Sequence, residues 1–231
     1  MKIDGWNVID EEGAVLWREY VFSGEATATA LVFRGSDGLV VVSPPSGLAA
    51  RDYDALAELG PVRALVANNS FHHMGQAAWR ARFKDAESYC PPGAVETLTK
   101  KTKGIPFRPL TELALPGNVH WEDAAGFKTG EALLSVKTGK GHVWFTGDLL
   151  TNIPRLPGGP FGWIMKWVDA APGFRLFKPA VWIAVKDKKA VRSWVTKEFA
   201  ERPPSIVVTS HGPAVDTGDV AALAREQIEK L

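Results

Sequence analysis

The sequence predicts an α/β protein that folds as a single domain over residues 1–231. Short β-like runs fill the first quarter of the chain, and strands then alternate with helices, which is the element order of an α/β fold. Apolar residues make up 45% of the chain and include 11 Phe and 9 Trp, enough for a large interior. A length of 231 residues is within the range of one α/β domain. This composition excludes an intrinsically disordered chain.

The first quarter of the chain is expected to form β-hairpins, because each β-like run is followed by Gly, Asp or Ser residues that favour turns. The run over 38–43 is apolar almost throughout, as in a strand buried on both faces. Pro44 and Pro45 end it, since proline cannot donate a hydrogen bond to a neighbouring strand. The predicted strands are 6–9, 15–21, 27–33 and 38–43.

Strands and helices alternate after residue 50. A helix over 51–59 is closed by Gly60 and Pro61, and a short buried strand over 63–67 follows it. Residues 104–126 have no clear periodicity and are expected to be irregular with one or two short strands. The elements expected between these segments are a helix over 76–83, a strand over 87–90 and a helix that begins near residues 91–92.

The second half begins with two expected strands and ends with a strand between two helices. Residues 151–179 are rich in Pro, Gly and aromatic side chains, so we expect a long loop that carries one helix and covers another part of the fold. The C-terminal helix is expected to be capped by Asp219 and to have one apolar face. The other predicted elements are strands 131–136 and 142–145, helix 187–201 and strand 205–209.

Charge and cysteine content limit the classes of function. The 27 Lys and Arg residues and 26 Asp and Glu residues give a net charge of +1, which disfavours a protein that binds nucleic acid or membranes by bulk charge. The single cysteine, Cys90, is expected to be a buried structural thiol, so a metal site must use nitrogen and oxygen ligands. The N-terminus lacks the apolar run of a signal peptide, and no stretch has the length of a membrane span. We therefore expect a cytoplasmic protein that acts on a small molecule.

Three of the five histidines lie directly after predicted buried strands. They are His72 and His73 after one strand and His211 after another, and Asp148 is a fourth such residue, at a third strand end. Neutral imidazoles with a carboxylate are ligands that Zn²⁺, Fe²⁺ or Mn²⁺ accept. Adjacent histidines alone are often only surface or hydrogen-bonding groups, so it is the combination of three strand-end loops that predicts a metal site.

The segments around these residues resemble the motifs of the metallo-β-lactamase superfamily. That family has an HxHxDH motif after a strand, a GHTxG-like turn, a TGD strand end and an SHG strand end. The matching segments here are NNSFHH (68–73), GFKTG (126–130), FTGD (145–148) and TSHG (209–212). The resemblance spans nearly the whole chain and implies an αββα four-layer sandwich of two mixed β-sheets with helices on the outside.

This sequence keeps ligand residues at one of the family's two metal sites and not at the other. The ligand positions of the first metal are occupied by Asn68, Ser70 and Phe127, so the resemblance implies that this site is lost. The ligand positions of the second metal remain filled by His72, His73, Asp148 and His211. The resemblance therefore implies one divalent metal ion, with zinc as the first choice and iron or manganese as alternatives.

The function implied by the resemblance is hydrolysis of a small ester, lactone, amide or phosphoester by metal-bound water. Asp148 is expected to be catalytic, and Asn68 and Ser70 are expected to hydrogen-bond the water or the substrate. A Ser70–His73–Asp148 triad has little support, since the serine lacks a glycine-flanked nucleophile elbow.

The resemblance also implies that the segment after Asp148 forms part of the substrate wall. Trp163, Lys166 and Trp167 lie there at helical spacing and would give an apolar pocket with one cationic group. An alternative function, favoured by the lost ligands of the first metal, is a non-catalytic ligand-binding or regulatory module. A redox protein with a single iron is a third interpretation, which draws only on the nitrogen and oxygen ligand set.

Overall fold

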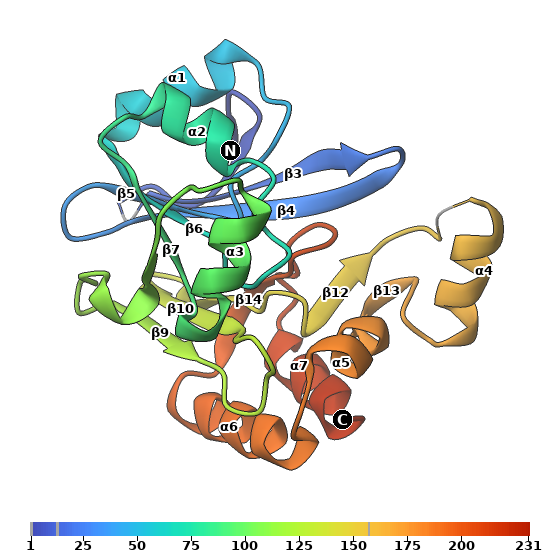
Figure 1. Cartoon of the computed structure of the whole chain (residues 1–231). Helices are drawn as coiled ribbons and strands as arrows, with labels where there is room; N and C mark the ends of the chain where they lie inside the picture. Colours follow the sequence, from blue (N-terminus) through green and yellow to red (C-terminus); the bar gives the residue numbers. More distant parts are fainter. Residues whose placement is uncertain (1, 13, 157) are drawn as a thin grey trace.

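The computed structural model describes residues 2–231 except 13 and 157, and its largest element is an eight-stranded mixed sheet. Strands β1 to β5 pair antiparallel as hairpins and β5 to β8 pair parallel, in sequence order across the sheet (Figure 1). The strands are β1 (Lys2–Ile3), β2 (Trp6–Asp10), β3 (Val15–Ser23), β4 (Ala26–Arg34), β5 (Leu39–Val42), β6 (Val62–Val66), β7 (Glu87–Cys90) and β8 (Phe107–Pro109).

A second, four-stranded sheet lies against the first and has the order β14-β11-β10-β9. Strand β14 pairs parallel with β11, and the other two pairs are antiparallel. A separate two-stranded ribbon pairs β12 with β13. These strands are β9 (Val119–Asp123), β10 (Ala132–Thr138), β11 (Gly141–Phe145), β12 (Leu150–Ile153), β13 (Gly173–Leu176) and β14 (Pro204–Val208).

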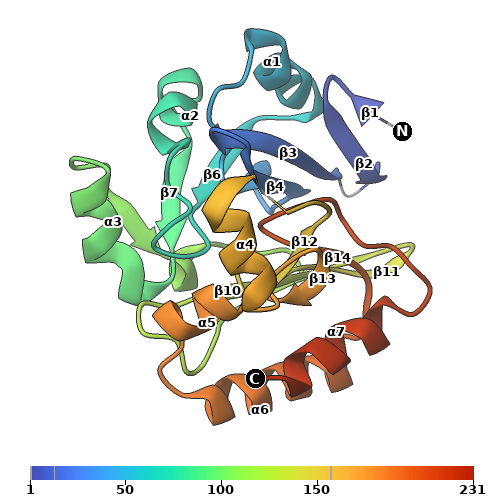
Figure 2. The same ribbon diagram turned by 90° about the vertical axis from the view of Figure 1, so that its right-hand side faces the viewer.

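Helices cover the outer faces of both sheets, which confirms the predicted αββα sandwich (Figures 1 and 2). Helices α1 (Ala50–Leu59) and α2 (Gln76–Arg82) lie on the first sheet, and α6 (Lys188–Glu201) and α7 (Val220–Glu229) lie on the second. The remaining helical elements are η1 (Pro92–Ala94), α3 (Val95–Lys101), η2 (Leu110–Glu112), α4 (Gly159–Trp167) and α5 (Lys178–Ala184). In the described part of the chain no helix is long and apolar enough to cross a membrane.

The alternation of side chains along the strands separates the core into layers. Phe145 lies between the two sheets with Val42 and Val66, whereas its neighbour Trp144 faces the outer helices with Phe199. Both aromatic rings of β11 are therefore buried, on opposite faces of one strand. Burying such a side chain stabilises the fold by about 1.5 to 3 kcal/mol, so this strand ties the two layers together.

The segment 151–179 differs most from its prediction. It contains β12, α4 and β13 and leads into α5, instead of forming a loop with one helix. The two strands have four residues each and pair only with one another, so neither shows a long periodic pattern. Asp219 does precede α7, but its side chain makes no capping hydrogen bond, and the apolar face of α7 against the second sheet supplies its stability.

Candidate metal centre

The candidate site lies where three strands from both sheets end. His72 follows β6, Asp148 follows β11 and His211 follows β14. The carboxyl ends of strands in α/β folds are the usual position of ligand sites, because the loops there project side chains into a common space. The fold thus brings together three residues that are far apart in the sequence.

Two glycines allow these loops to turn tightly. Gly147 has a φ of +54°, and a methyl group there would overlap the carboxylate of Glu131. Gly212 has a φ of +94°, and a methyl group there would overlap the backbone carbonyl of Asn152. Glycine adopts such positive φ values without steric cost, which explains the glycine next to Asp148 and the one next to His211.

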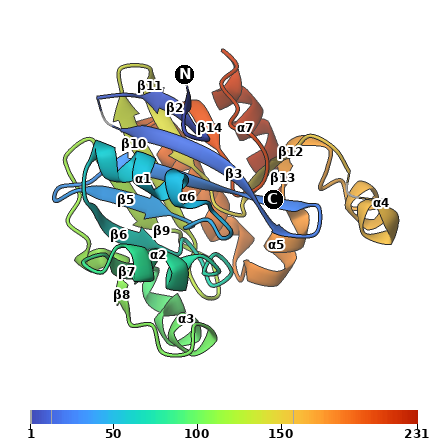
Figure 3. The same ribbon diagram turned by 90° about the horizontal axis from the view of Figure 1, so that it is seen from above.

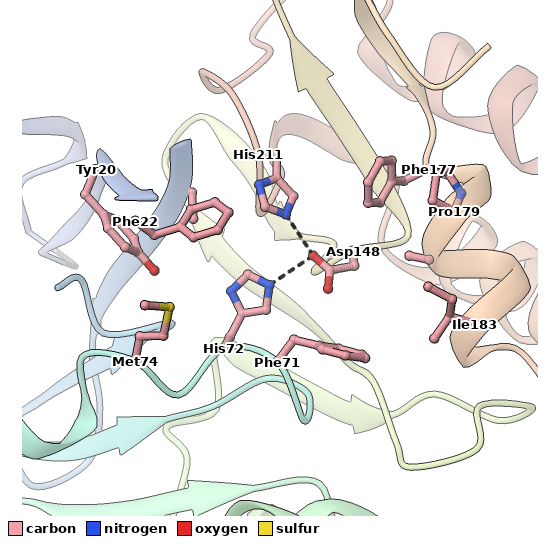
Figure 4. A pocket seen from close by; sticks show the side chains of 12 residues that line it. Tyr20, Phe22, Phe71, His72, Met74, Asp148, Phe177, Pro179, Ile183 and His211 are labelled. Carbon is pink, nitrogen blue, oxygen red and sulfur yellow. Dashed lines mark hydrogen bonds and ion pairs between the residues drawn. The ribbon is translucent and has the colours of Figure 1, made fainter. Parts of the chain in front are cut away.

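The two imidazoles converge on one carboxylate oxygen (Figure 4). His72 Nε2 lies 2.9 Å from Asp148 Oδ1, and His211 Nε2 lies 3.4 Å from the same atom. One potential ligand atom from each of the three residues lies within 4.8 Å of the others. Their side chains are 6%, 11% and 19% exposed for His72, Asp148 and His211, respectively. The cluster is buried but is open to a pocket that all three residues line.

The backbone of β4 sets the orientation of the His211 ring. His211 Nδ1 donates a hydrogen bond to the carbonyl oxygen of Thr27 at 2.7 Å. When the ring is neutral and carries its proton on Nδ1, the lone pair of Nε2 is free to bind a metal ion beside Asp148. This is how metal-binding histidines are commonly held, with the non-ligating nitrogen bonded to a backbone carbonyl.

Asn69 holds the carboxylate of Asp148 and Glu131 holds Asn69, and neither residue was predicted from the sequence. Asn69 Nδ2 donates to Asp148 Oδ2 at 2.8 Å and to Glu131 Oε2 at 2.9 Å, while its Oδ1 accepts from the backbone nitrogen of Phe71 at 2.8 Å. The other oxygen of Asp148 therefore faces the imidazoles. The available signal was position, because Asn69 lies inside the 68–73 motif and Glu131 directly follows the 126–130 turn.

The charges of the cluster depend on one another. Burial alone would raise the pKa of Asp148, but the adjacent imidazoles of His72 and His211 hold it well below its usual range. Burial alone would lower the pKa of His211, but the hydrogen bond and charge of Asp148 raise it above its usual value. Burial and the charge of Asp148 raise the pKa of Glu131. In the metal-free protein Asp148 is thus an anion that favours protonated His211.

The metal-free protein is expected to lose stability as the pH rises above about 6.5 and through the raised pKa of His211. An unfolded histidine titrates near pH 6.5, so above that pH the folded chain keeps on His211 a proton that the unfolded chain has released. The free energy of unfolding then falls as the pH passes through the raised pKa, by at most about 1.4 kcal/mol per pH unit. Thermal unfolding of the chelator-treated protein would measure this slope, and His211→Gln should flatten it. An equal slope in that variant would contradict the assignment.

The Asn69→Ala substitution is expected to weaken metal binding by about 10- to 100-fold, the usual cost of losing a group that orients a ligand. Asp148 would keep its charge but lose the hydrogen bond that fixes its orientation. Competition with a chromophoric chelator measures the affinity. Asn118→Ala is the matched control, because Asn118 is exposed and, among the described residues, its side chain bonds only to the backbone of Lys137. Equal affinities in the two variants would show that Asn69 has no orienting role.

The donor set fits a divalent metal ion. Two imidazole nitrogens and one carboxylate oxygen are the ligands of many catalytic zinc sites, in which a fourth position stays open. The same set also suits iron or manganese. His72, Asp148 and His211 would hold the ion, with one net positive charge left around a divalent metal.

His73 does not join the other three residues, which corrects the predicted set of four ligands. Its Nδ1 lies 3.0 Å from the carbonyl oxygen of Phe71, and it belongs to no metal-ligand cluster in the described part of the chain. Burial and the nearby charge of Lys101 lower the pKa of His73. Successive side chains in this loop diverge, so His72 faces the pocket and His73 does not line it.

Asn68 and Ser70 also lie elsewhere than predicted. Asn68 is fully buried, its Oδ1 accepts from Ser43 Oγ at 2.5 Å, and its Nδ2 donates to Glu131 Oε1 at 2.8 Å. Ser70 Oγ lies 3.4 Å from Thr129 Oγ1. Neither residue lines the pocket as the structure describes it. Both the oxygen and the nitrogen of the Asn68 side chain are hydrogen-bonded inside the core, so this residue stabilises the core instead of contacting water or substrate. Phe127 is half-buried and packs against the core around α6.

The predicted substrate wall is not part of the pocket. Trp163 and Trp167 are 75% and 81% exposed, and Lys166 is exposed as well. These residues lie on α4, which stands out from the body of the molecule (Figures 1 and 3). Helix α4 turns Met165 inward, so its other side faces solvent, and none of the three residues is among the described lining of the pocket.

The cluster around His120 and the thiol of Cys90 have structural roles instead of binding a metal ion or reacting. His120 Nε2 lies 3.6 Å from the carboxylates of Glu122 and Glu198, but Arg202 Nη2 is only 3.2 Å from that nitrogen and pairs with Glu198. The guanidinium already supplies the positive charge that a cation would bring. Cys90 is buried, and burial, with the charge of Asp123, raises its pKa to about 12, so it is an unreactive thiol as expected.

Solved structures match nearly the whole chain, although no family model and no curated protein matches the sequence. A metallo-β-lactamase from Erythrobacter litoralis with β-mercaptoethanol in its active site has a TM-score of 0.61 and 14% identity over 100% of this chain and 99% of that one. The metallo-β-lactamase FIM-1 from Pseudomonas aeruginosa, in its mono-zinc form, has a TM-score of 0.60 and 15% identity over 97% and 94%. The DIM-1 metallo-β-lactamase has a TM-score of 0.61 and 13% identity over 97% and 96%.

Proposed function

We propose that this chain, which has the metallo-β-lactamase fold, is a hydrolase that works with one divalent metal ion, zinc in the first place. The observation that carries the proposal is the convergence of His72 Nε2, Asp148 Oδ1 and His211 Nε2 at the wall of a pocket. Three protein ligands with an open position are typical of catalytic zinc sites. The mono-zinc form of FIM-1 supports the view that this fold can hold a single zinc ion.

Zinc bound at such a site lowers the pKa of water and polarises a carbonyl or phosphoryl oxygen. The chain's own residues prepare the position for it. Thr27 fixes the ring of His211, Asn69 fixes Asp148, and the buried setting strengthens the charge interactions. The substrate classes open to this chemistry are small esters, lactones, amides and phosphoesters.

A non-catalytic ligand-binding module is the second candidate function. Asn68, Ser70 and Phe127 occupy positions that bind the first metal in the resembled family, and Asn68 is built into the core network instead. In such a module the two histidines and Asp148 would be hydrogen-bonding groups toward a ligand.

Metal content separates the two functions. Untagged protein, purified without chelator or nickel resin, is expected to contain about one equivalent of zinc, iron or manganese by plasma mass spectrometry. A chelator should then lower its Tm, since a ligand bound only to the folded state adds stability. The loaded protein should hydrolyse at least one of the four substrate classes. Protein that stays empty after incubation with all three ions would support the binding module and overturn the hydrolase.

A further inference from the structure

The pocket at the metal centre is lined almost entirely by carbon. Its volume is about 290 Å³, at the small end of ligand pockets, so it suits a small molecule. Apolar side chains from the β3–β4 hairpin face apolar side chains from the segment around α5 across the cluster (Figure 4). The lining residues outside the cluster are Tyr20, Phe22, Ala28, Phe71, Met74, Phe177, Pro179, Ala180 and Ile183.

The hairpin wall follows from the strand period. Tyr20 and Phe22 are two residues apart on β3 and point to one face, whereas Val21 between them is 60% exposed on the other. Ala28 on β4 pairs with Tyr20, and this small side chain leaves room for the pocket. The sequence thus builds an apolar wall opposite Phe177 and Ile183.

No cation in the described lining could pair with an anionic substrate, apart from a histidine that is protonated or a bound metal ion. The adjoining cavity, which shares Phe22, Phe177 and His211, has Glu19 and Glu25 in its wall against one guanidinium, Arg155. Burying an unpaired charge in such surroundings costs several kcal/mol. A carboxylate or phosphate beyond the reacting group would therefore bind poorly.

Tyr20 is the one polar residue in the described lining outside the cluster of His72, Asp148 and His211. Its phenol points into the pocket (Figure 4), and no described residue accepts a hydrogen bond from its hydroxyl. Burial and the charge of Asp148 raise the pKa of Tyr20 well above its usual range, so the hydroxyl keeps its proton. A phenol that stays neutral is a suitable donor to a carbonyl oxygen.

On the basis of the proposed function, we propose that the substrate is an uncharged carbonyl compound, an ester, lactone or amide, with a small apolar acyl group. The acyl group lies between Phe22 and Phe177, and Tyr20 donates a hydrogen bond to the carbonyl oxygen. Hydrolysis consumes one water: its oxygen bonds to the carbonyl carbon, the bond from that carbon to the leaving oxygen or nitrogen breaks, and the leaving atom takes a proton. Substrates that carry a charged group beyond the reacting carbonyl are excluded.

Two esters of equal chain length test the charge preference. Methyl hexanoate ends in a methyl group, and monomethyl adipate carries a carboxylate at the same distance from the ester. Calorimetry on metal-free protein should give at least about 10-fold tighter binding of methyl hexanoate, and kcat/KM of the zinc-loaded protein should favour it by a similar factor, because the charge has no partner. Equal or better use of monomethyl adipate, or of a phosphodiester, would overturn the inference.

Surface substitutions give a second, independent test. Ile183 lines the pocket and is 61% exposed, so Ile183→Lys adds a cation without disturbing the core, and it should reduce the preference for methyl hexanoate at least about threefold. Trp182→Lys is the matched control, since Trp182 is 57% exposed and is not in the described lining, and it should leave the preference unchanged. An unchanged preference in Ile183→Lys would count against the pocket as the acyl site.

Tyr20→Phe removes only the hydroxyl. We expect kcat/KM to fall about 5- to 10-fold, the usual value of one hydrogen bond, with metal content and Tm unchanged. No change in kcat/KM would refute this role for Tyr20. The proposed function and this inference can fail separately. A zinc-loaded protein that binds methyl hexanoate but hydrolyses nothing would refute the hydrolase and leave the preference of the pocket for uncharged molecules standing. A zinc-loaded protein that hydrolyses charged substrates better would refute that preference and leave the hydrolase standing.

Discussion

His72→Ala is expected to abolish tight metal binding, whereas His73→Ala should leave it intact. The first substitution removes one of three ligands, and its cost should exceed the 10- to 100-fold loss that follows from removing a group that only orients a ligand. The second removes a ring that contacts the backbone of Phe71 and belongs to no metal-ligand cluster in the described chain. Metal per chain and competition with a chromophoric chelator measure both variants.

These neighbours form a matched pair, because they share a loop and a side-chain type. If both variants lost the metal, the four-ligand site implied by the sequence motif would be restored, with a loop arrangement in which both rings turn inward. If neither variant lost it, the ion would be bound elsewhere, and the pocket would lose its assigned chemistry. The expected outcome supports a site of His72, Asp148 and His211 alone.

The layered fold could be predicted because its strands have strong local signals. The Val-rich run that became β5 is buried along its whole length and ends before Pro44, as expected from its sequence. The ribbon of β12 and β13 could not be found in this way. Its two short strands are separated by α4 and form only because the chain folds back on itself, and a pairing of this kind leaves little trace in local sequence.

The candidate site was predictable where a strand end dictates position, and not where side-chain direction decides. The structure brings His72, Asp148 and His211 together because each follows a strand that ends at the same place in the fold. Spacing cannot tell which of two adjacent loop histidines faces inward, so His73 was included wrongly in the cluster that the structure describes.

The residues that line the pocket could not be predicted from the sequence either, because their positions depend on packing between distant segments. Tyr20 and Phe177 come from segments more than a hundred residues apart, and only the packed structure places them around one cavity. Trp163 and Trp167 were expected there because the segment after Asp148 often forms the substrate wall in the resembled family, yet α4 turns both rings outward.

Gly212→Ala is expected to destabilise the protein and weaken its metal site. The β12 strand holds this loop, since Asn152 donates from its backbone nitrogen to the His211 carbonyl at 2.8 Å and from its side chain to Pro213 at 2.9 Å. A methyl group on Gly212 would overlap the Asn152 carbonyl and would require a positive φ that alanine disfavours. Backbone strain and overpacking each cost about 1 to 3 kcal/mol, so Tm should fall by roughly 5 to 20 °C.

Gly218→Ala is the control for Gly212→Ala, because it tests whether any replacement of glycine by alanine in this connection destabilises the protein. Gly218 is exposed, lies in the same connection to α7, and has no atom near the position of an added methyl group. Its replacement should leave Tm unchanged or raise it slightly, because alanine restricts the unfolded chain. Thermal unfolding and metal titration of both variants would decide the matter. A Gly212→Ala protein with the Tm and metal affinity of Gly218→Ala would mean that the loop can move away from Asn152, and that His211 does not need this clamp to reach Asp148.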